Sequence, residues 1–132
     1  MCTPLVVIIE DIEDFAEHRR EQFESQGCTV FILRDLESAT RFYESLLERS
    51  WTEPVVILFD WQLGSDKTDD LVRRAVEDRE AKKHRFILVG ASSHQDSPRR
   101  QRRQGLFVPE DPDEGLAQEI LAYTQSYSSS HS

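Results

Sequence analysis

Cysteine is scarce in this sequence, which has two among its 132 residues, Cys2 and Cys28. Two thiols this far apart match no metal-binding spacing, and they cannot build the disulfide framework that stabilises small secreted domains. We therefore expect no structural zinc and no disulfide, and we expect the protein to reside in a reducing cytoplasm.

Long hydrophobic runs are missing as well. No apolar stretch approaches the ~20 residues that a membrane-spanning helix needs. The first residues, Met-Cys-Thr-Pro, lack the basic region and the apolar stretch of a secretion signal. The sequence therefore supports neither membrane insertion nor secretion.

Positive charge is outnumbered, with 16 Lys and Arg against 25 Asp and Glu and a formal net charge of -9 at pH 7. Nucleic acid and anionic lipid reward basic surfaces, so we expect no general affinity for either. The glycine-rich phosphate loop and the Ser-His-Asp and Cys-His patterns of common enzymes are also absent. Hydrophobic residues still make up 38% of the chain, enough for the core of one globular domain.

Short apolar runs recur along the chain at regular intervals. They are rich in Val, Ile, Leu and Phe and lack polar alternation, which is typical of strands buried on both faces of a parallel sheet. The expected strands are residues 5–9, 30–33, 55–59, 86–89 and, more weakly, 106–108.

The stretches between these runs have helical spacing. The first, residues 14–26, is expected to bury Phe15 and Phe23, and Gly27 then supplies a left-handed stop. The polar residues of this helix are expected to face water: His18, Arg19, Arg20 and Glu21.

The later helices follow the same alternation with strands. They are expected at residues 36–49, around Leu71, Val72, Ala75 and Val76, in the polar segment 98–104, and around Leu116, Ile120 and Leu121. Repeated strand-helix units imply an α/β fold, a parallel sheet with helices on both faces. We expect one domain over residues 1–123 and a flexible polar tail over 124–132.

Acidic residues stand where two of the expected strands end. Glu10 and Asp11 follow the first strand, and Asp60 follows the third. The carboxyl ends of parallel strands meet at one edge of the sheet, so the three carboxylates should converge there. Such a cluster is costly unless a cation neutralises it, and Mg²⁺ prefers oxygen ligands of this kind. The alternative is that each residue only ends a strand or begins a helix in solvent.

Residues 4–123 resemble the receiver domain of response regulators in two-component signalling. The resemblance rests on Ile-Ile-Glu-Asp after the first strand, on Val-Val-Ile-Leu-Phe-Asp-Trp-Gln-Leu around Asp60, and on Pro-Glu-Asp-Pro-Asp-Glu before the last helix. It implies a flavodoxin-like (βα)5 doubly wound sandwich, with a five-stranded parallel sheet of order 2-1-3-4-5. It also implies that Asp60 is the phospho-acceptor and that Glu10, Asp11, Asp60 and the backbone carbonyl of Gln62 bind Mg²⁺.

The sequence departs from the receiver pattern at the positions that sense the phosphoryl group. The pattern has a Thr or Ser at the end of the fourth strand, where this chain has Gly90, followed by Ala91; Ser92 and Ser93 come just after. The pattern also has a lysine before the proline that follows the fifth strand. Here Val108 precedes Pro109, and an apolar side chain cannot replace the ammonium. After Asp60, Gly64 and Thr68 stand at the usual proline and glycine positions.

These departures indicate an atypical receiver or pseudo-receiver that is not an enzyme and signals mainly by docking. The implied partners are a histidine kinase or phosphotransfer protein, a downstream signalling protein, or a second copy of the chain. Four arginines on the polar fourth helix mark a candidate partner surface: Arg99, Arg100, Arg102 and Arg103. The alternatives are a solvated helix face for the arginines and, for the chain, a small metal-dependent enzyme that handles phosphate.

Overall fold

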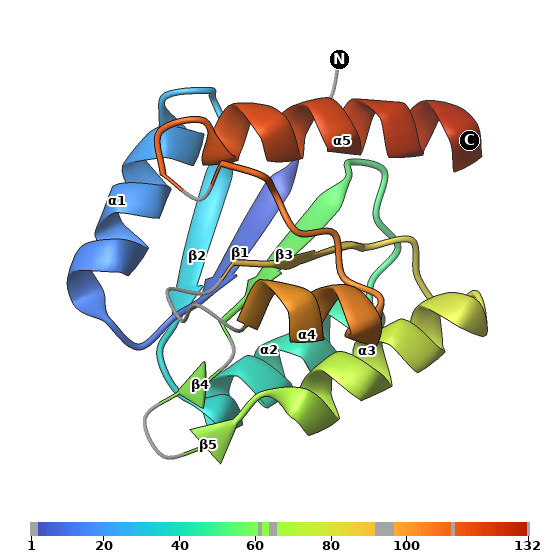
Figure 1. Ribbon diagram of the computed structural model, residues 1–132. Coiled ribbons are helices and arrows are strands. Elements are labelled where there is room, and N and C mark those ends of the chain that lie inside the picture. Colours follow the sequence, from blue (N-terminus) through green and yellow to red (C-terminus); the bar gives the residue numbers. More distant parts are fainter. Residues whose placement is uncertain (1–2, 61, 64–65, 92–96, 112, 132) are drawn as a thin grey trace.

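A four-stranded parallel sheet forms the centre of the computed structural model (Figure 1). The structure describes residues 3–60, 62–63, 66–91, 97–111 and 113–131. The strands lie in the order β2-β1-β3-β6, as the resemblance implies for the first four. Their bounds are β1 (Leu5–Ile9), β2 (Thr29–Leu33), β3 (Val55–Phe59) and β6 (Ile87–Gly90).

The strands end at a common level. Ile9, the last residue of β1, pairs with both Leu33 and Phe59, the last residues of its two neighbours. On the other side of β3, Phe59 pairs with Gly90 at the end of β6. Residues that directly follow these strands therefore meet at one edge of the sheet.

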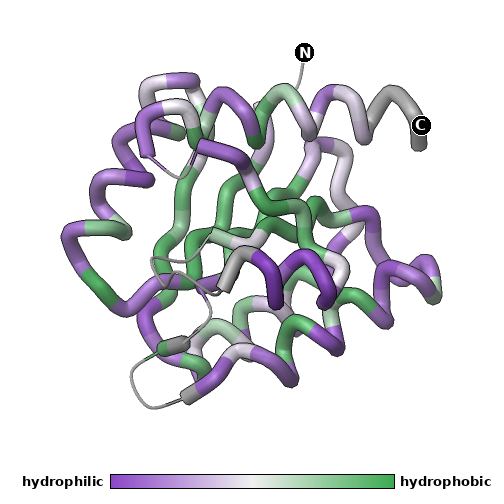
Figure 2. Tube along the Cα trace, in the orientation of Figure 1, coloured by the Kyte–Doolittle hydropathy of each residue, from purple (hydrophilic) through white to green (hydrophobic). Residues whose placement is uncertain are grey.

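Helices cover both faces of the sheet. Alternate residues of each strand point to opposite faces, so each strand contributes to two groups of packed side chains. Val7 and Ile9 pack with α2 and α3, whereas Val6 and Ile8 pack with α1 and α5. Figure 2 shows the apolar strands enclosed by helices with hydrophilic outer faces. The helix bounds are α1 (Glu13–Glu24), α2 (Leu36–Leu47), α3 (Asp69–Glu80), α4 (Ser97–Gln104) and α5 (Leu116–His131).

The buried face of α1 differs from the expected one. Phe15 is 43% exposed, whereas Arg19 is only 6% exposed. The inward row is Ala16, Arg19 and Phe23, at spacings of three and four residues. The expectation that Phe15 is buried and Arg19 faces water is therefore wrong, and Arg19 lies in an apolar row where it needs a charged partner.

The expected fifth strand is reduced to one bridge. Within the described residues, the sheet ends at β6, and only Phe107 pairs beyond it, in parallel with Val89. The Phe107 amide donates to the Leu88 carbonyl at 2.9 Å, and the Phe107 carbonyl accepts from the Gly90 amide at 2.8 Å. Pro109 has no amide hydrogen to extend this ladder. The five-stranded sheet implied by the resemblance is thus corrected to four strands.

Helix α5 continues through residues 124–131, where the sequence predicts a flexible tail. Thr124 is buried, and its hydroxyl donates to the Ile120 carbonyl at 2.8 Å. Tyr127 lies 6.1 Å from Tyr123, between ring centroids. These contacts allow the helix to extend past the boundary expected from composition. None of the described helices combines the length and the apolar character that a membrane crossing requires.

His84, which lies just before β6, gives a testable pH dependence. Its Nδ1 accepts from the Phe86 amide at 3.1 Å, so Nε2 carries the proton and donates to the Ala75 carbonyl at 3.0 Å. Burial lowers the pKa of His84, although the Ala75 carbonyl opposes that shift. A folded-state pKa below the unfolded value of about 6.5 means that stability is present above that pH and is lost as the pH falls through the folded value.

We therefore expect the wild-type protein to lose more stability between pH 7 and pH 5 than His84→Gln does. Urea unfolding at a series of pH values measures the two slopes. His18→Gln is the matched control, because it replaces a histidine that is exposed and lies outside the core. Equal slopes in wild type and His84→Gln would contradict this assignment.

Candidate functional site

Three carboxylates meet at the carboxyl edge of the sheet. Glu10 and Asp11 follow β1, and Asp60 follows β3. The strand ladder continues into this site, because the Glu10 amide donates to the Leu33 carbonyl at 3.0 Å and the Asp60 amide donates to the Ile9 carbonyl at 3.1 Å. One carboxylate oxygen from each acidic residue lies within 4.8 Å of those of the other two. We call this group the acidic triad.

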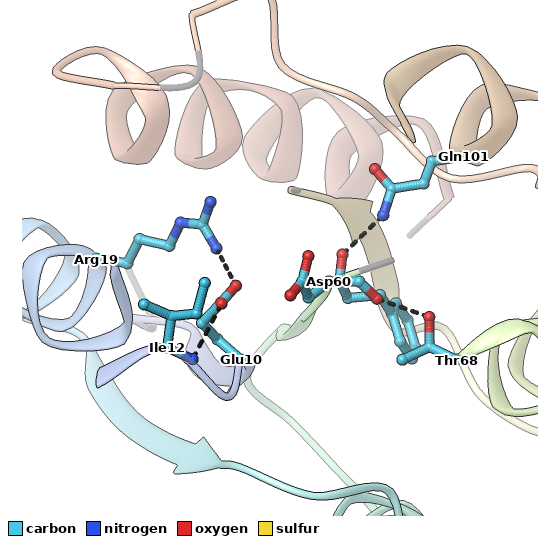
Figure 3. Close-up of polar contacts among 7 residues, drawn as sticks. Glu10, Ile12, Arg19, Asp60, Thr68 and Gln101 are labelled. Atoms are coloured by element: carbon cyan, nitrogen blue, oxygen red, sulfur yellow. Dashed lines mark hydrogen bonds and ion pairs between the residues drawn. The ribbon is translucent and has the colours of Figure 1, made fainter. Parts of the chain in front are cut away.

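Glu10 is the most enclosed member of the acidic triad, with no exposed surface. Its Oε2 accepts from Nη1 of Arg19 at 3.0 Å, and its Oε1 accepts from the Ile12 amide at 3.3 Å (Figure 3). Burial, followed by the negative charge of Asp60, raises the pKa of Glu10 to about 7, while Arg19 opposes that rise. The Glu10 carboxyl is thus harder to ionise than a solvated one, despite its ion pair with Arg19.

A hard divalent cation fits this donor set. The acidic triad offers three oxygen donors at short mutual distances, and carboxylate oxygens are the ligands that Mg²⁺ prefers. A bound cation would also relieve the repulsion that raises the pKa of Glu10. Glu10, Asp11 and Asp60 are therefore the side chains that could hold a metal ion.

The backbone around Asp60 is held by two side chains that the sequence analysis did not assign to the site. The Thr68 hydroxyl, at the start of α3, donates to the Asp60 carbonyl at 2.6 Å. Nε2 of Gln101, from α4, donates to the Phe59 carbonyl at 2.9 Å. Figure 3 shows both approaching from the side opposite Arg19. These contacts fix the position of Asp60 from outside its own strand.

Gln101 fills the space beside Gly90. A Cβ atom on Gly90 would lie 2.6 Å from Oε1 of Gln101 and 2.7 Å from its Cβ and Cδ. Gln101 is 1% exposed, and its Oε1 has no hydrogen-bond partner within the described part of the chain. The position where the receiver pattern has a hydroxyl is therefore occupied by an amide from a neighbouring helix.

A signal for Gln101 was present in the sequence. It stands between two arginine pairs, in Arg-Arg-Gln-Arg-Arg, and Gln104 follows three residues later on the same helix face. Nε2 of Gln104 donates to Oδ1 of Asp69 at 3.0 Å. A neutral stripe on an otherwise basic helix would have indicated the buried face of α4.

Solved structures that are similar to this chain include receiver domains of response regulators. A response regulator receiver domain from Methanospirillum hungatei JF-1 superposes with a TM-score of 0.70 at 14% identity, covering 98% of this chain and 99% of that chain. One from Methylobacillus flagellatus gives a TM-score of 0.64 at 16% identity, covering 96% and 99%. This chain has the receiver-domain fold. No protein-family model and no curated protein matches the sequence.

A third similar structure, the receiver domain of the Francisella response regulator 1452, gives a TM-score of 0.69 at 15% identity, covering 93% of this chain and 98% of that chain. The superpositions establish the receiver fold. Because the identities are low, the chemistry of the site follows only from the residues of this chain.

Val108, which stands where the receiver pattern has a lysine, directly follows Phe107, the residue that bridges to β6. Val108 is partly buried and Pro109 is buried, and their role as altered switch positions stays a prediction. Phe107 stacks on Tyr123 of α5, with ring centroids 4.0 Å apart and planes 11° apart. Ala91, the residue that follows β6, is buried.

Some expectations fall on residues outside the described part of the chain. Among them are Ser92 and Ser93, as substitutes for the missing hydroxyl, and Trp61, which follows Asp60 in sequence. The backbone of Gln62 is described: it lies in β4 (Gln62–Leu63), which pairs with β5 (Asp66–Lys67) in an antiparallel hairpin. The metal-binding role of its carbonyl stays a prediction.

The predicted polar helix exists as α4, and its arginines reach solvent. All four are exposed: Arg99, Arg100, Arg102 and Arg103. Gln101 and Gln104 attach the opposite side of this helix to β3 and α3. The receiver fold thus presents a fixed basic helix next to the acidic triad.

Proposed function

We propose that this chain is a receiver domain of two-component signal transduction in which Asp60 accepts a phosphoryl group with the help of a divalent metal ion. The observation that carries the proposal is the acidic triad, whose oxygens lie within 4.8 Å of one another at the carboxyl edge of the sheet in a receiver fold. Parallel α/β sheets bind their ligands at this edge.

The residues divide into two roles in the proposed reaction. Glu10, Asp11, Asp60 and the backbone carbonyl of Gln62 would hold Mg²⁺, which supplies charge stabilisation to the phosphoryl oxygens. One oxygen of Asp60 forms a bond to phosphorus as the bond between phosphorus and the donor's histidine nitrogen breaks. Thr68 and Gln101 hold the carbonyls of Asp60 and Phe59, and this keeps the nucleophile in place.

The response to phosphorylation is proposed to be atypical. Gly90 offers no hydroxyl and Val108 offers no ammonium, so the phosphoryl group lacks the two contacts by which it would rearrange the surface. We propose that the domain signals mainly by docking, in the cytoplasm, to a kinase or phosphotransfer protein and to an output partner. The exposed arginines of α4 would meet acidic groups on that partner.

Tryptophan fluorescence tests the proposal, because Trp61 follows Asp60 in sequence. The chain has two tryptophans, and Trp51→Phe leaves Trp61 as the single reporter. Trp51 donates to the Leu46 carbonyl at 2.8 Å and precedes β3, at the opposite edge of the sheet from Asp60. We expect Mg²⁺ to change the fluorescence and beryllofluoride, added after Mg²⁺, to change it again.

The same titration separates the alternatives. No change in fluorescence on either addition would overturn the acceptor function and leave a domain that only docks. Turnover of a small phosphoester under the same conditions would instead identify a metal-dependent enzyme. A response to Mg²⁺ alone would keep the metal site and remove the phosphoryl acceptor.

A further inference from the structure

Arg19 is a buried cation placed by the fold against the acidic triad. It lies in the inward row of α1 between Ala16 and Phe23, and it is 6% exposed. Burying a guanidinium costs free energy unless a charged partner offsets that cost. The partner is Glu10, at 3.0 Å between Nη1 and Oε2, and the Glu10 side chain is fully buried. This ion pair is part of the site and not of the solvated surface.

The ion pair changes the charge and the free ligand positions of the acidic triad. Three ionised carboxylates and one guanidinium give a formal charge of -2 for this group. Glu10 already uses Oε2 for Arg19 and Oε1 for the Ile12 amide. A metal ion that binds Glu10 must therefore share it with Arg19 or displace the guanidinium.

The guanidinium of Arg19 comes to the site from α1. Phe107, Val108 and Pro109, which follow α4, carry no charged side chain, so these residues bring no ammonium to the acidic triad. Arg19 reaches it from α1, on the opposite side from Thr68 and Gln101 (Figure 3). The charge that Arg19 brings to Glu10 is therefore independent of residues 107–109.

We propose that Arg19 is an internal counter-ion of the acidic triad, which holds the triad together without metal and weakens its affinity for divalent cations. The proposal rests on the metal site of the proposed function and not on phosphorylation of Asp60. Like charges repel, so Arg19 opposes an incoming cation and competes with it for Glu10. Without Arg19 the same carboxylates would depend on metal for their stability.

Mn²⁺ binding tests the proposal directly, because electron paramagnetic resonance measures the free ion without any protein reporter. We expect Arg19→Gln to bind Mn²⁺ about tenfold more tightly than wild type. In EDTA this variant should unfold at a lower urea concentration than wild type, and added Mg²⁺ should close most of that gap. Arg19→Lys keeps the charge and should bind Mn²⁺ with an affinity close to that of wild type.

Arg20→Gln is the matched control, because it removes the same charge from the next residue, which pairs with Glu17 and Glu24 instead of the triad. Its Mn²⁺ affinity should match that of wild type. Equal or weaker binding by Arg19→Gln, with wild type still binding, would overturn the counter-ion role and leave the metal site intact. If Arg19→Gln does not fold, Arg19→Lys decides, since a large change in its affinity would show that geometry matters and charge does not. Absence of binding in every variant would overturn the metal site and this role together.

Discussion

Gly90→Thr should destabilise the protein by about 2 kcal/mol, the usual cost of overpacking a core, even though it restores the hydroxyl of the receiver pattern. A Cβ at this position meets the Gln101 side chain at 2.6 to 2.7 Å. Gly90 is buried at the end of β6, and Gln101 is held by its hydrogen bond to Phe59. Neither residue can move aside cheaply. Urea unfolding of the variant and of wild type measures the difference.

A second substitution separates this clash from other effects of threonine. Gly90→Thr combined with Gln101→Ala should be more stable than the sum of the two single changes predicts, because alanine at 101 vacates the space that threonine needs. Gln104→Ala is the matched control. It removes a hydrogen bond of the same helix, to Asp69, without contacting Gly90, so it should not rescue Gly90→Thr. Additive effects in both pairs would contradict a steric conflict between Gly90 and Gln101.

The framework of the site could be predicted from the sequence because its determinants are local. Continuous apolar runs identify buried parallel strands, and the residue after such a run lies at the carboxyl edge of the sheet. Glu10, Asp11 and Asp60 were placed together on that basis alone, and the structure brings them together. The polar helix containing the four arginines was also predicted, at nearly its observed bounds.

The residues that complete the site could not be predicted in the same way. Periodicity assigns polar residues to solvent, so it places Arg19 on the outer face of α1; the neutral stripe of α4 marks Gln101 as inward-facing but does not indicate its partner. Both are buried because each satisfies a specific group, Glu10 or the Phe59 carbonyl, that belongs to a distant part of the chain. Periodicity carries no information about such partners.

The prediction of a fifth strand was wrong for a related reason. Residues 106–108 have strand-like composition, but strand formation depends on how many backbone groups find partners in the neighbouring strand. Phe107 is the only residue there that pairs with β6 within the described part of the chain. The same short segment carries Val108 in place of the expected lysine. The missing strand and the departure from the receiver pattern thus fall on the same short segment.

Asp60→Asn should abolish the response to beryllofluoride and any incorporation of phosphate, because an amide is not a nucleophile toward phosphorus. It should also stabilise the metal-free protein by about 1 to 2 kcal/mol, the size of one relieved like-charge contact in a partly polar environment. Glu10 is fully buried, and burial followed by the Asp60 charge raises its pKa to about 7. Removing the Asp60 charge relieves that repulsion, so Mg²⁺ should stabilise the variant less than wild type.

Two variants control this result. Asp14→Asn removes one charge from the exposed first turn of α1 and should change neither phosphate incorporation nor the stability in EDTA appreciably. Asp11→Asn removes a proposed metal ligand but keeps the nucleophile, so incorporation should be slowed and not abolished. Phosphate label that persists in Asp60→Asn would show that another residue is the acceptor. A loss of stability in EDTA would show that the Asp60 carboxylate holds the fold together through contacts that outweigh its repulsion with Glu10.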